Sequence, residues 1–262
     1  LGWPDDTEDL RYFYPTTVRE TGYDILFFWV AREMMMCQEL TGKAPFKIIY
    51  LHGLVRDEKG RKFSKTKKIG FDPLEMVEQY GADALRMALV YGTSAGRDLL
   101  ISPDKVISMR NFTNKIWNAA RFILMNQEVR NSIHQPADEI QDKLQILNLK
   151  KQDKDDQRIL ASLDKTIKSV TQDMENYRFG QAAEKLYAFF WHEFCDIYLE
   201  QTKKRLYNES RPKERGEALT VLTFVLKESL KLLHPFMPYV TEEIWTNQLK
   251  EAVPLVVSPW PK

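Results

Sequence analysis

Two patterns of hydrophobic and polar positions divide the chain near residue 100. Before it, short β-branched and aromatic runs alternate with loops, and the run over residues 46–51 predicts a buried strand that delivers His52 and Gly53 to a sheet edge. After it, apolar positions recur with a period of about 3.6 residues, which indicates helices. We therefore expect an α-rich protein, with a partial α/β half-domain over residues 1–100 and an all-α helical bundle over residues 101–262.

Capping and turn residues predict where helices, strands and loops lie within the first hundred residues. The opening twenty residues predict loop, with a short strand over residues 15–18. An apolar helix is expected over residues 25–40, with Asp24 near its start as a candidate N-cap. The remaining signals predict a hairpin over residues 54–66 and helices over residues 73–80 and 82–91.

Longer helices are predicted in the second part. A helix capped by residues 102–104 is expected to run to about residue 125, and residues 126–151 predict a loop with at most a short helix. Pro235 and Pro238, which follow His234, are expected to end one helix and start the last. A lone histidine before a proline at such a corner is expected to have a structural role. Three helices are expected between these, over about residues 153–176, 180–207 and 213–233, the middle one with an aromatic core face.

Composition narrows the classes of function. The 38 basic and 37 acidic residues nearly balance, so any nucleic-acid contact depends on local patches. The two cysteines, Cys37 and Cys195, are too far apart in sequence to suggest a zinc site or a disulfide framework. The most apolar stretch, residues 25–31, is too short to span a bilayer. We expect a cytoplasmic protein with no structural metal and no membrane contact.

A cationic loop is the first candidate site. Residues 59–68 contain six Lys or Arg. Lys62 and Lys65, with Ser64 between them, can place two ammonium groups and a hydroxyl on one small anion, such as a leaving pyrophosphate. The alternative is a solvated basic loop without a ligand.

A polar stripe on the helix after residue 102 is the second candidate. Arg110, Asn114, Asn118 and Arg121 recur at helical spacing, with Trp117 nearby. The stripe is a hydrogen-bonded seam between helices, a surface that faces RNA, on which Trp117 could stack a base, or both.

These motifs resemble those of the class Ia aminoacyl-tRNA synthetases. Residues 62–66, KFSKT, resemble the second class I signature, Lys-Met-Ser-Lys-Ser, and their flanks HGLVRDEKGR and DPLEMVEQYGADALR match as well. Residues 20–32, ETGYDILFFWVAR, are similar to the Gly-x-Asp-x-x-x-x-Trp element. RNFTNKIWNAARF and LHPFMPYVTEEIW resemble the first and last helices of the anticodon-binding bundle. The resemblance implies a Rossmann-like nucleotide-binding half-domain followed by an anticodon-binding domain.

The resemblance also implies roles for single residues. Lys62, Ser64 and Lys65 would be catalytic, and Trp29 would line the amino-acid pocket. The polar stripe would bind tRNA through Arg110, Asn114, Trp117, Asn118 and Arg121. ATP, which carries Mg²⁺ with it, would be bound by Asp24 at the ribose and by His52, Gly53 and Lys65.

Within class Ia, the motifs are most similar to those of the valine-specific members. The implied partners are valine, ATP and tRNA(Val), and the implied state is a monomer. The first class signature, His-x-Gly-His, does not occur among the four histidines, so we expect a C-terminal fragment that is inactive alone and lacks the editing domain. The alternatives are a catalytically inactive RNA-binding module and an isoleucine-specific relative.

Overall fold

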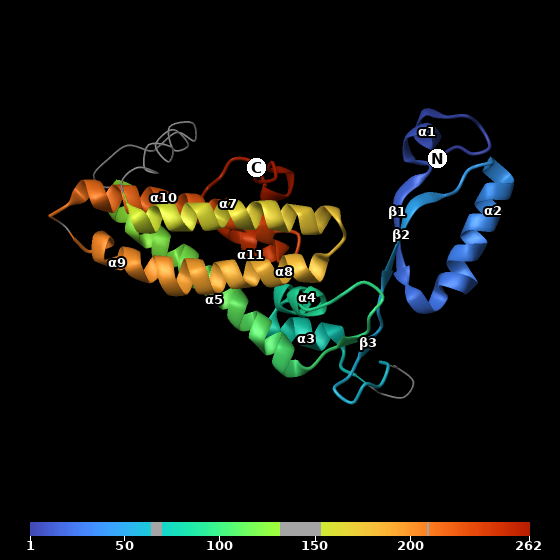
Figure 1. The fold of residues 1–262 in the computed structure, drawn as a ribbon, viewed down its shortest axis with the longest axis horizontal. Helices are drawn as coiled ribbons and strands as arrows, with labels where there is room; N and C mark the ends of the chain where they lie inside the picture. Colours follow the sequence, from blue (N-terminus) through green and yellow to red (C-terminus); the bar gives the residue numbers. More distant parts are fainter. Residues whose placement is uncertain (64–69, 132–152, 209) are drawn as a thin grey trace. The chain divides into compact units, whose positions relative to one another are not determined.

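The structure is a computed structural model that describes residues 1–63, 70–131, 153–208 and 210–262 (Figure 1). Its internal contacts group the chain into two compact units. The first unit comprises residues 1–70 and 93–100, and the second comprises residues 71–92 and 101–262. Residues 71–92, which the sequence places with the first hundred, therefore pack with the helical unit.

The first unit contains a parallel pair of strands joined through a helix. Strand β1 (Thr16–Gly22) pairs with β2 (Phe46–His52). Between them lie a 3₁₀ turn (Tyr23–Ile25), a π-helical turn (Leu26–Val30) and helix α2 (Ala31–Thr41), a crossover of the kind that parallel strands need.

Three expectations for this region need correction. Helix α1 (Glu8–Phe13), capped by Thr7, lies where loop was predicted, and β1 is longer than the predicted strand. The predicted strand β2 is present, but none of its residues is buried. The reason is that β2 pairs only with β1 among the described residues, so the sheet lacks the neighbours that would cover it.

A second short sheet anchors the predicted hairpin. Strand β3 (Val55–Arg56) pairs in parallel with β4 (Leu99–Leu100), and Arg56 also forms an antiparallel bridge to Lys62. The amide of Gly60 donates to the Asp57 carbonyl at 2.9 Å, which closes the turn. The hairpin is confirmed as far as residue 63, whereas β4 was not predicted.

The second unit is helical, and side-chain caps fix where three of its described helices start. The Asp72 carboxylate accepts a hydrogen bond from the Leu74 amide at 2.9 Å. Ser102 and Asp153 cap in the same way. The helices are α3 (Pro73–Tyr80), α4 (Ala82–Val90), α5 (Pro103–Asn131), α7 (Lys154–Glu175), α8 (Phe179–Ala188), α9 (Glu200–Leu206), α10 (Pro212–Leu233) and α11 (Pro238–Glu243), with π-helical stretches at Phe189–Leu199 and Ile244–Gln248 and a 3₁₀ turn at Leu255–Val257.

The three predicted long helices are confirmed, although the middle one is π-helical at its centre. Helix α5 extends beyond the predicted end near residue 125 to Asn131. The predicted aromatic core is also confirmed, because the side chains of Phe189, Phe190, Phe194 and Tyr198 are all buried.

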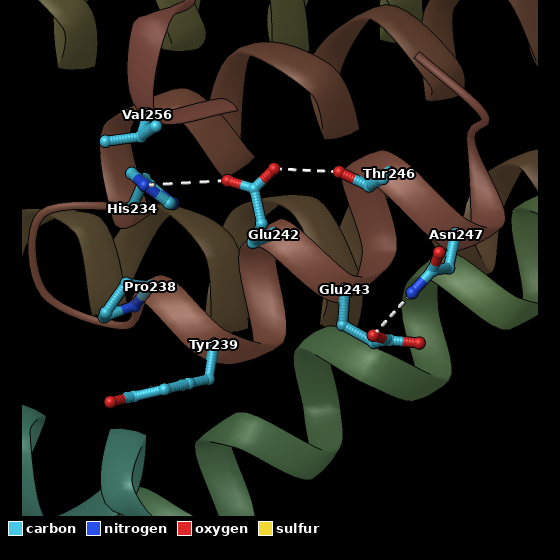
Figure 2. A pocket seen from close by; sticks show the side chains of 8 residues that line it. All are labelled: His234, Pro238, Tyr239, Glu242, Glu243, Thr246, Asn247 and Val256. Atoms are coloured by element: carbon cyan, nitrogen blue, oxygen red, sulfur yellow. Dashed lines mark hydrogen bonds and ion pairs between the residues drawn. The ribbon is translucent and has the colours of Figure 1, made fainter. Parts of the chain in front are cut away.

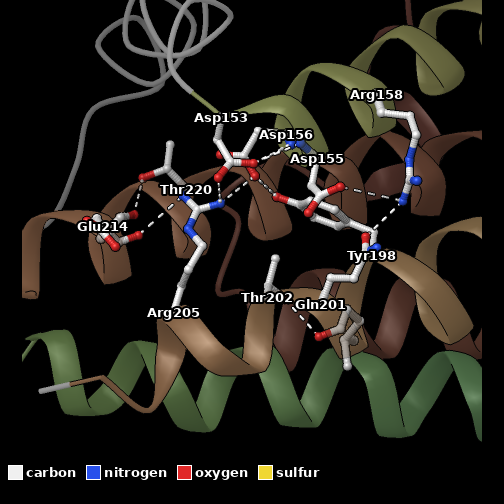
Figure 3. A network of polar contacts seen from close by, with 12 residues as sticks. Asp153, Asp155, Asp156, Arg158, Tyr198, Gln201, Thr202, Arg205, Glu214 and Thr220 are labelled. Carbon is white, nitrogen blue, oxygen red and sulfur yellow. Dashed lines mark hydrogen bonds and ion pairs between the residues drawn. The ribbon is translucent and has the colours of Figure 1, made fainter.

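A buried acid lies beside this aromatic core. Asp156 is only 1% exposed, and its carboxylate accepts hydrogen bonds from the Tyr198 hydroxyl at 2.6 Å and from Arg205 at 2.7 Å (Figure 3). Arg205 also lies 3.5 Å from Asp153, the cap of α7. The network therefore compensates the buried charge and ties α7 to the following helices.

Helix α4 is fixed to the corner between α10 and α11. The Asp83 carboxylate accepts hydrogen bonds from the amides of Tyr239 at 3.2 Å and Val240 at 2.6 Å. Arg86 donates to the carbonyls of Pro235 and Phe236. Arg86 therefore bonds the backbone of this corner in the second unit.

Among the described residues, no helix is long and apolar enough to cross a membrane, and no cluster of three potential metal ligands occurs. Cys37 and Cys195 are both free, and burial raises the pKa of the Cys195 thiol to about 12.

Candidate functional site

The carboxyl ends of β1 and β2 bring predicted site residues together. The register pairs Gly22 with His52, and Asp24 follows two residues after β1 ends. A Cβ atom added to Gly22 would lie 2.8 Å from Asp24 Oδ1 and 3.5 Å from His52 Cε1. The missing side chain at Gly22 therefore lets the aspartate and the histidine approach each other at the strand ends.

Lys62 joins this group from the hairpin. Its Nζ atom lies 3.0 Å from Asp24 Oδ2, although the two residues are 38 positions apart. Asp24 makes no side-chain N-cap bond, so the capping alternative is wrong. The contact brings a predicted ribose ligand and a predicted phosphate ligand within one hydrogen bond of each other.

His52 is held between two acceptors. Its Nδ1 atom lies 2.7 Å from the Gly53 carbonyl, and its Nε2 atom lies 3.2 Å from Glu20 Oε1. Glu20 was not among the predicted site residues. Its position two residues before Gly22 on the same strand could have identified it, because alternate strand residues share a face.

Gly53 allows close packing of the backbone. A Cβ atom at this position would lie 1.8 Å from the Arg97 carbonyl oxygen. The adjoining bonds run from the Gly96 amide to the Leu51 carbonyl at 2.8 Å and from the Leu99 amide to the Leu54 carbonyl at 2.9 Å. Glycine is therefore required here by packing within the first unit, whatever its contact with ATP.

Asp98 fixes the base of the hairpin and was also missed. Its carboxylate accepts a hydrogen bond from the Leu54 amide at 2.8 Å and another from Arg56. The Leu54 amide first, and then the Arg56 guanidinium, lower the pKa of this carboxyl below its ordinary value. An ionised Asp98 thus orients the strand that leads to Lys62.

Part of the cationic loop, residues 64–69, lies outside the residues that the structure describes. Ser64 and Lys65 fall outside the described residues, so their predicted roles stay predictions. The Phe63 ring packs against Gly70, where an added Cβ atom would lie 2.6 Å from ring carbons. Gly70 has φ of 102°, so only glycine combines this backbone conformation with this contact.

Trp29, the predicted pocket residue, lies on the π-helical turn and is 59% exposed. Phe27 and Phe28 beside it are also exposed. The described residues therefore do not bury the predicted amino-acid pocket.

The predicted polar stripe on α5 is mainly a solvent-facing surface. Asn114, Trp117, Asn118 and Arg121 are exposed, while Arg110 is half-buried. Within the described part of the chain, the side chains of Asn114, Asn118 and Arg121 make no hydrogen bond or ion pair. Among the described residues, these three side chains therefore do not form a hydrogen-bonded seam between helices.

An open groove in the helical unit is lined by residues of α11 and by residues before and after it (Figure 2). His234 Nδ1 lies 2.8 Å from the Thr241 hydroxyl oxygen, and burial lowers the pKa of this histidine. Glu242 accepts from the hydroxyl of Thr246 at 2.8 Å, and Glu243 accepts from Asn247 at 2.7 Å. The histidine is structural, as predicted, and both carboxylates bond within the groove.

Family models match both parts of the chain. One, for class I tRNA synthetases (I, L, M and V), matches residues 1–102, and another, for the anticodon-binding domain of tRNA ligases, matches residues 156–262. With the paired strands, the motifs at their ends and the helical unit, these matches define the class. The chain belongs to the class I tRNA synthetases.

Within that family, the chain aligns with valine–tRNA ligases. It is 45% identical to that of Clostridium tetani over 262 residues, 50% identical to that of Symbiobacterium thermophilum over 245, and 45% identical to that of Thermotoga maritima over 262. These alignments cover 100%, 94% and 100% of this chain, and 28%, 26% and 28% of the relatives. Nothing in them favours an RNA-binding module or an isoleucine-specific relative.

Solved structures confirm the predicted fold class. The LeuRS of Agrobacterium radiobacter, in complex with tRNA and LeuAMS, superposes with a TM-score of 0.69 over 95% of this chain and 28% of its own, at 22% identity. The apo methionyl-tRNA synthetase of Mycobacterium tuberculosis gives 0.70 over 93% of this chain and 46% of its own, at 19% identity.

Proposed function

We propose that this chain supplies the second-signature loop and the tRNA-binding helical unit of an enzyme that joins valine to tRNA(Val). Residues 1–100 would complete the site of valine activation, and residues 101–262 would bind the tRNA. The enzyme would act as a monomer in the cytoplasm. The observation that carries the proposal is the contact between Lys62 and Asp24 at the ends of two parallel strands.

Valine activation would use the charges gathered at these strand ends. The valine carboxylate attacks the α-phosphate of ATP and forms valyl adenylate, while pyrophosphate leaves. The Lys62 and Lys65 ammonium groups and the Ser64 hydroxyl would stabilise the charge that develops on pyrophosphate, and Mg²⁺ would arrive with ATP as part of the substrate.

The remaining residues would orient the substrates. The Asp24 carboxylate would accept hydrogen bonds from the ribose hydroxyls, and His52 and Gly53 would lie along the nucleotide. Trp29 would offer an apolar face to the valine side chain. The terminal ribose hydroxyl of tRNA(Val) would then accept the valyl group.

The tRNA would lie along the exposed face of α5. Arg110 and Arg121 would contact phosphates, Asn114 and Asn118 would donate hydrogen bonds, and Trp117 would stack on a base. The support for this proposal is that most of the stripe is open to solvent.

The test is valine-dependent exchange between ATP and pyrophosphate, measured in the full-length enzyme that contains this chain. Lys62→Ala is expected to lower the exchange rate by about a hundredfold, because a charge that stabilises the transition state is lost. Lys59→Ala, which removes an exposed lysine of the same hairpin, is the matched control and should stay near wild type. Equal rates for the Lys62 variant and the control would contradict the proposed site.

A further inference from the structure

Arg110 differs from the other members of the α5 stripe in its surroundings. It is half-buried, and its guanidinium carbon lies 5.6 Å from the centre of the Tyr80 ring. Its Nε atom is buried and has no hydrogen-bond partner within the described part of the chain. The stem of the side chain is therefore packed, and recognition must use the terminal nitrogens.

Tyr80 holds a fixed place in the same unit. It is the last residue of α3, and Gly81, with φ of 90°, turns the chain directly into α4. The two amides that bond Asp83 fix α4 in turn to α11. The ring that faces Arg110 is thus carried by two joined helices and not by a mobile loop.

A cation–π contact such as this one uses the ring and not a lone-pair acceptor, so it leaves the N–H donors of Arg110 available. The N–H donors of arginine lie in the plane of the group, so contact with an aromatic face competes little with a phosphate acceptor. Holding the group in advance also lowers the conformational entropy lost on binding.

We propose that Tyr80 is a positioning residue for tRNA, which holds the Arg110 guanidinium ready to bind a backbone phosphate. The proposal rests on the proposed contact between Arg110 and tRNA. It adds α3, which the sequence did not connect with RNA, to the elements that form the binding surface.

The test is a double-mutant cycle on tRNA affinity, with a tRNA(Val) transcript as the probe and the full-length enzyme that contains this chain as the protein. Tyr80→Leu is expected to weaken binding by about two- to fivefold, the usual strength of an exposed cation–π contact. Tyr80→Phe keeps the ring and should bind as wild type does. Tyr80→Met is a second ring-free variant if the leucine variant fails to fold, and Tyr12→Leu in the first unit is the matched control.

The cycle distinguishes failure of the positioning role of Tyr80 from failure of the proposed contact between Arg110 and tRNA. Arg110→Ala should weaken binding and reduce the salt slope by about one, and Tyr80→Leu should then add nothing in that background. If Arg110→Ala weakens binding but Tyr80→Leu alone does not, or if Tyr80→Leu weakens it equally in both backgrounds, the positioning role is wrong while the tRNA contact stands. If Arg110→Ala has no effect, the proposed contact itself is wrong and the positioning role falls with it.

Discussion

Asp83 shows how one buried carboxylate can organise a helix that is distant in sequence. It is 4% exposed and caps α11 across more than 150 positions, with Arg86 on the next turn of α4 bonding the same corner. Burial raises the pKa of Asp83, while the amides of Val240 and Tyr239 favour its charged form. No local pattern in the sequence could pair these residues, because the cap comes from a different helix.

Removing this cap should destabilise the helical unit. Asp83→Ala leaves the buried amide of Val240 and the part-buried amide of Tyr239 without this acceptor, and it is expected to cost about 1–3 kcal/mol of unfolding free energy. Asp83→Asn keeps one acceptor oxygen and should cost less. Urea unfolding of both variants measures the difference, and an alanine variant as stable as wild type would mean that water replaces the cap.

The buried carboxylate of Asp173 is expected to make the stability of the helical unit depend on pH. Asp173 is 2% exposed, and its carboxylate lies 2.5 Å from Lys185 Nζ and 2.8 Å from Arg178 Nε. Burial alone would raise its pKa, but the bonds to Lys185 and Arg178 outweigh burial and lower it. A lowered pKa in the folded state means that the charged form contributes stability above the unfolded pKa of about 4.

That contribution should be lost as pH falls through the lowered pKa. Asp173→Asn is expected to reduce the unfolding free energy at pH 7 by about 1–3 kcal/mol, and the deficit should shrink once wild type is protonated. Urea unfolding over a pH series measures this trend. Asp164→Asn, which removes an exposed partner of Lys168, is the control and should differ little from wild type at any pH. A deficit for Asp173→Asn that is constant down to pH 2 would contradict the assignment.

At the level of elements, local signals were sufficient for most helices of the second unit. Asp72, Ser102 and Asp153 cap helices where the sequence predicts them, since capping needs only neighbouring residues. The existence of strand β4 and the exposure of β2 depend on residues that are distant in the chain, so neither could be predicted from local sequence. Tyr80 and Asp98 escaped for the same reason.

Helix α5 carries a prediction that belongs to the element as a whole. If its exposed face binds tRNA, Arg121→Ala should weaken binding and lower the salt slope by about one, because one phosphate contact is lost. The melting temperature should hardly change, because the side chain is exposed and makes no polar contact with described residues. Titrations of tRNA at several salt concentrations, with parallel melts, test both statements. Unchanged affinity would remove Arg121 from the interface.

For the whole molecule, the near balance of 38 basic and 37 acidic residues leaves recognition to local groups. The two candidate sites follow this rule: one is a few charges at strand ends, and the other is one face of a helix. The sequence located both through motifs. It could not give the contacts that orient them, because these join residues such as Asp24 and Lys62 that lie far apart in the chain.

The division of the chain between its units has a consequence for how the protein is made. The first unit stops at residue 70, the helical unit takes residues 71–92, and the first unit resumes at residues 93–100. During synthesis, β3 must therefore wait for its partner β4 until α3 and α4 have left the ribosome. A gene cut at any single codon would also leave at least one unit incomplete, so exchange by recombination is expected to move the two units together.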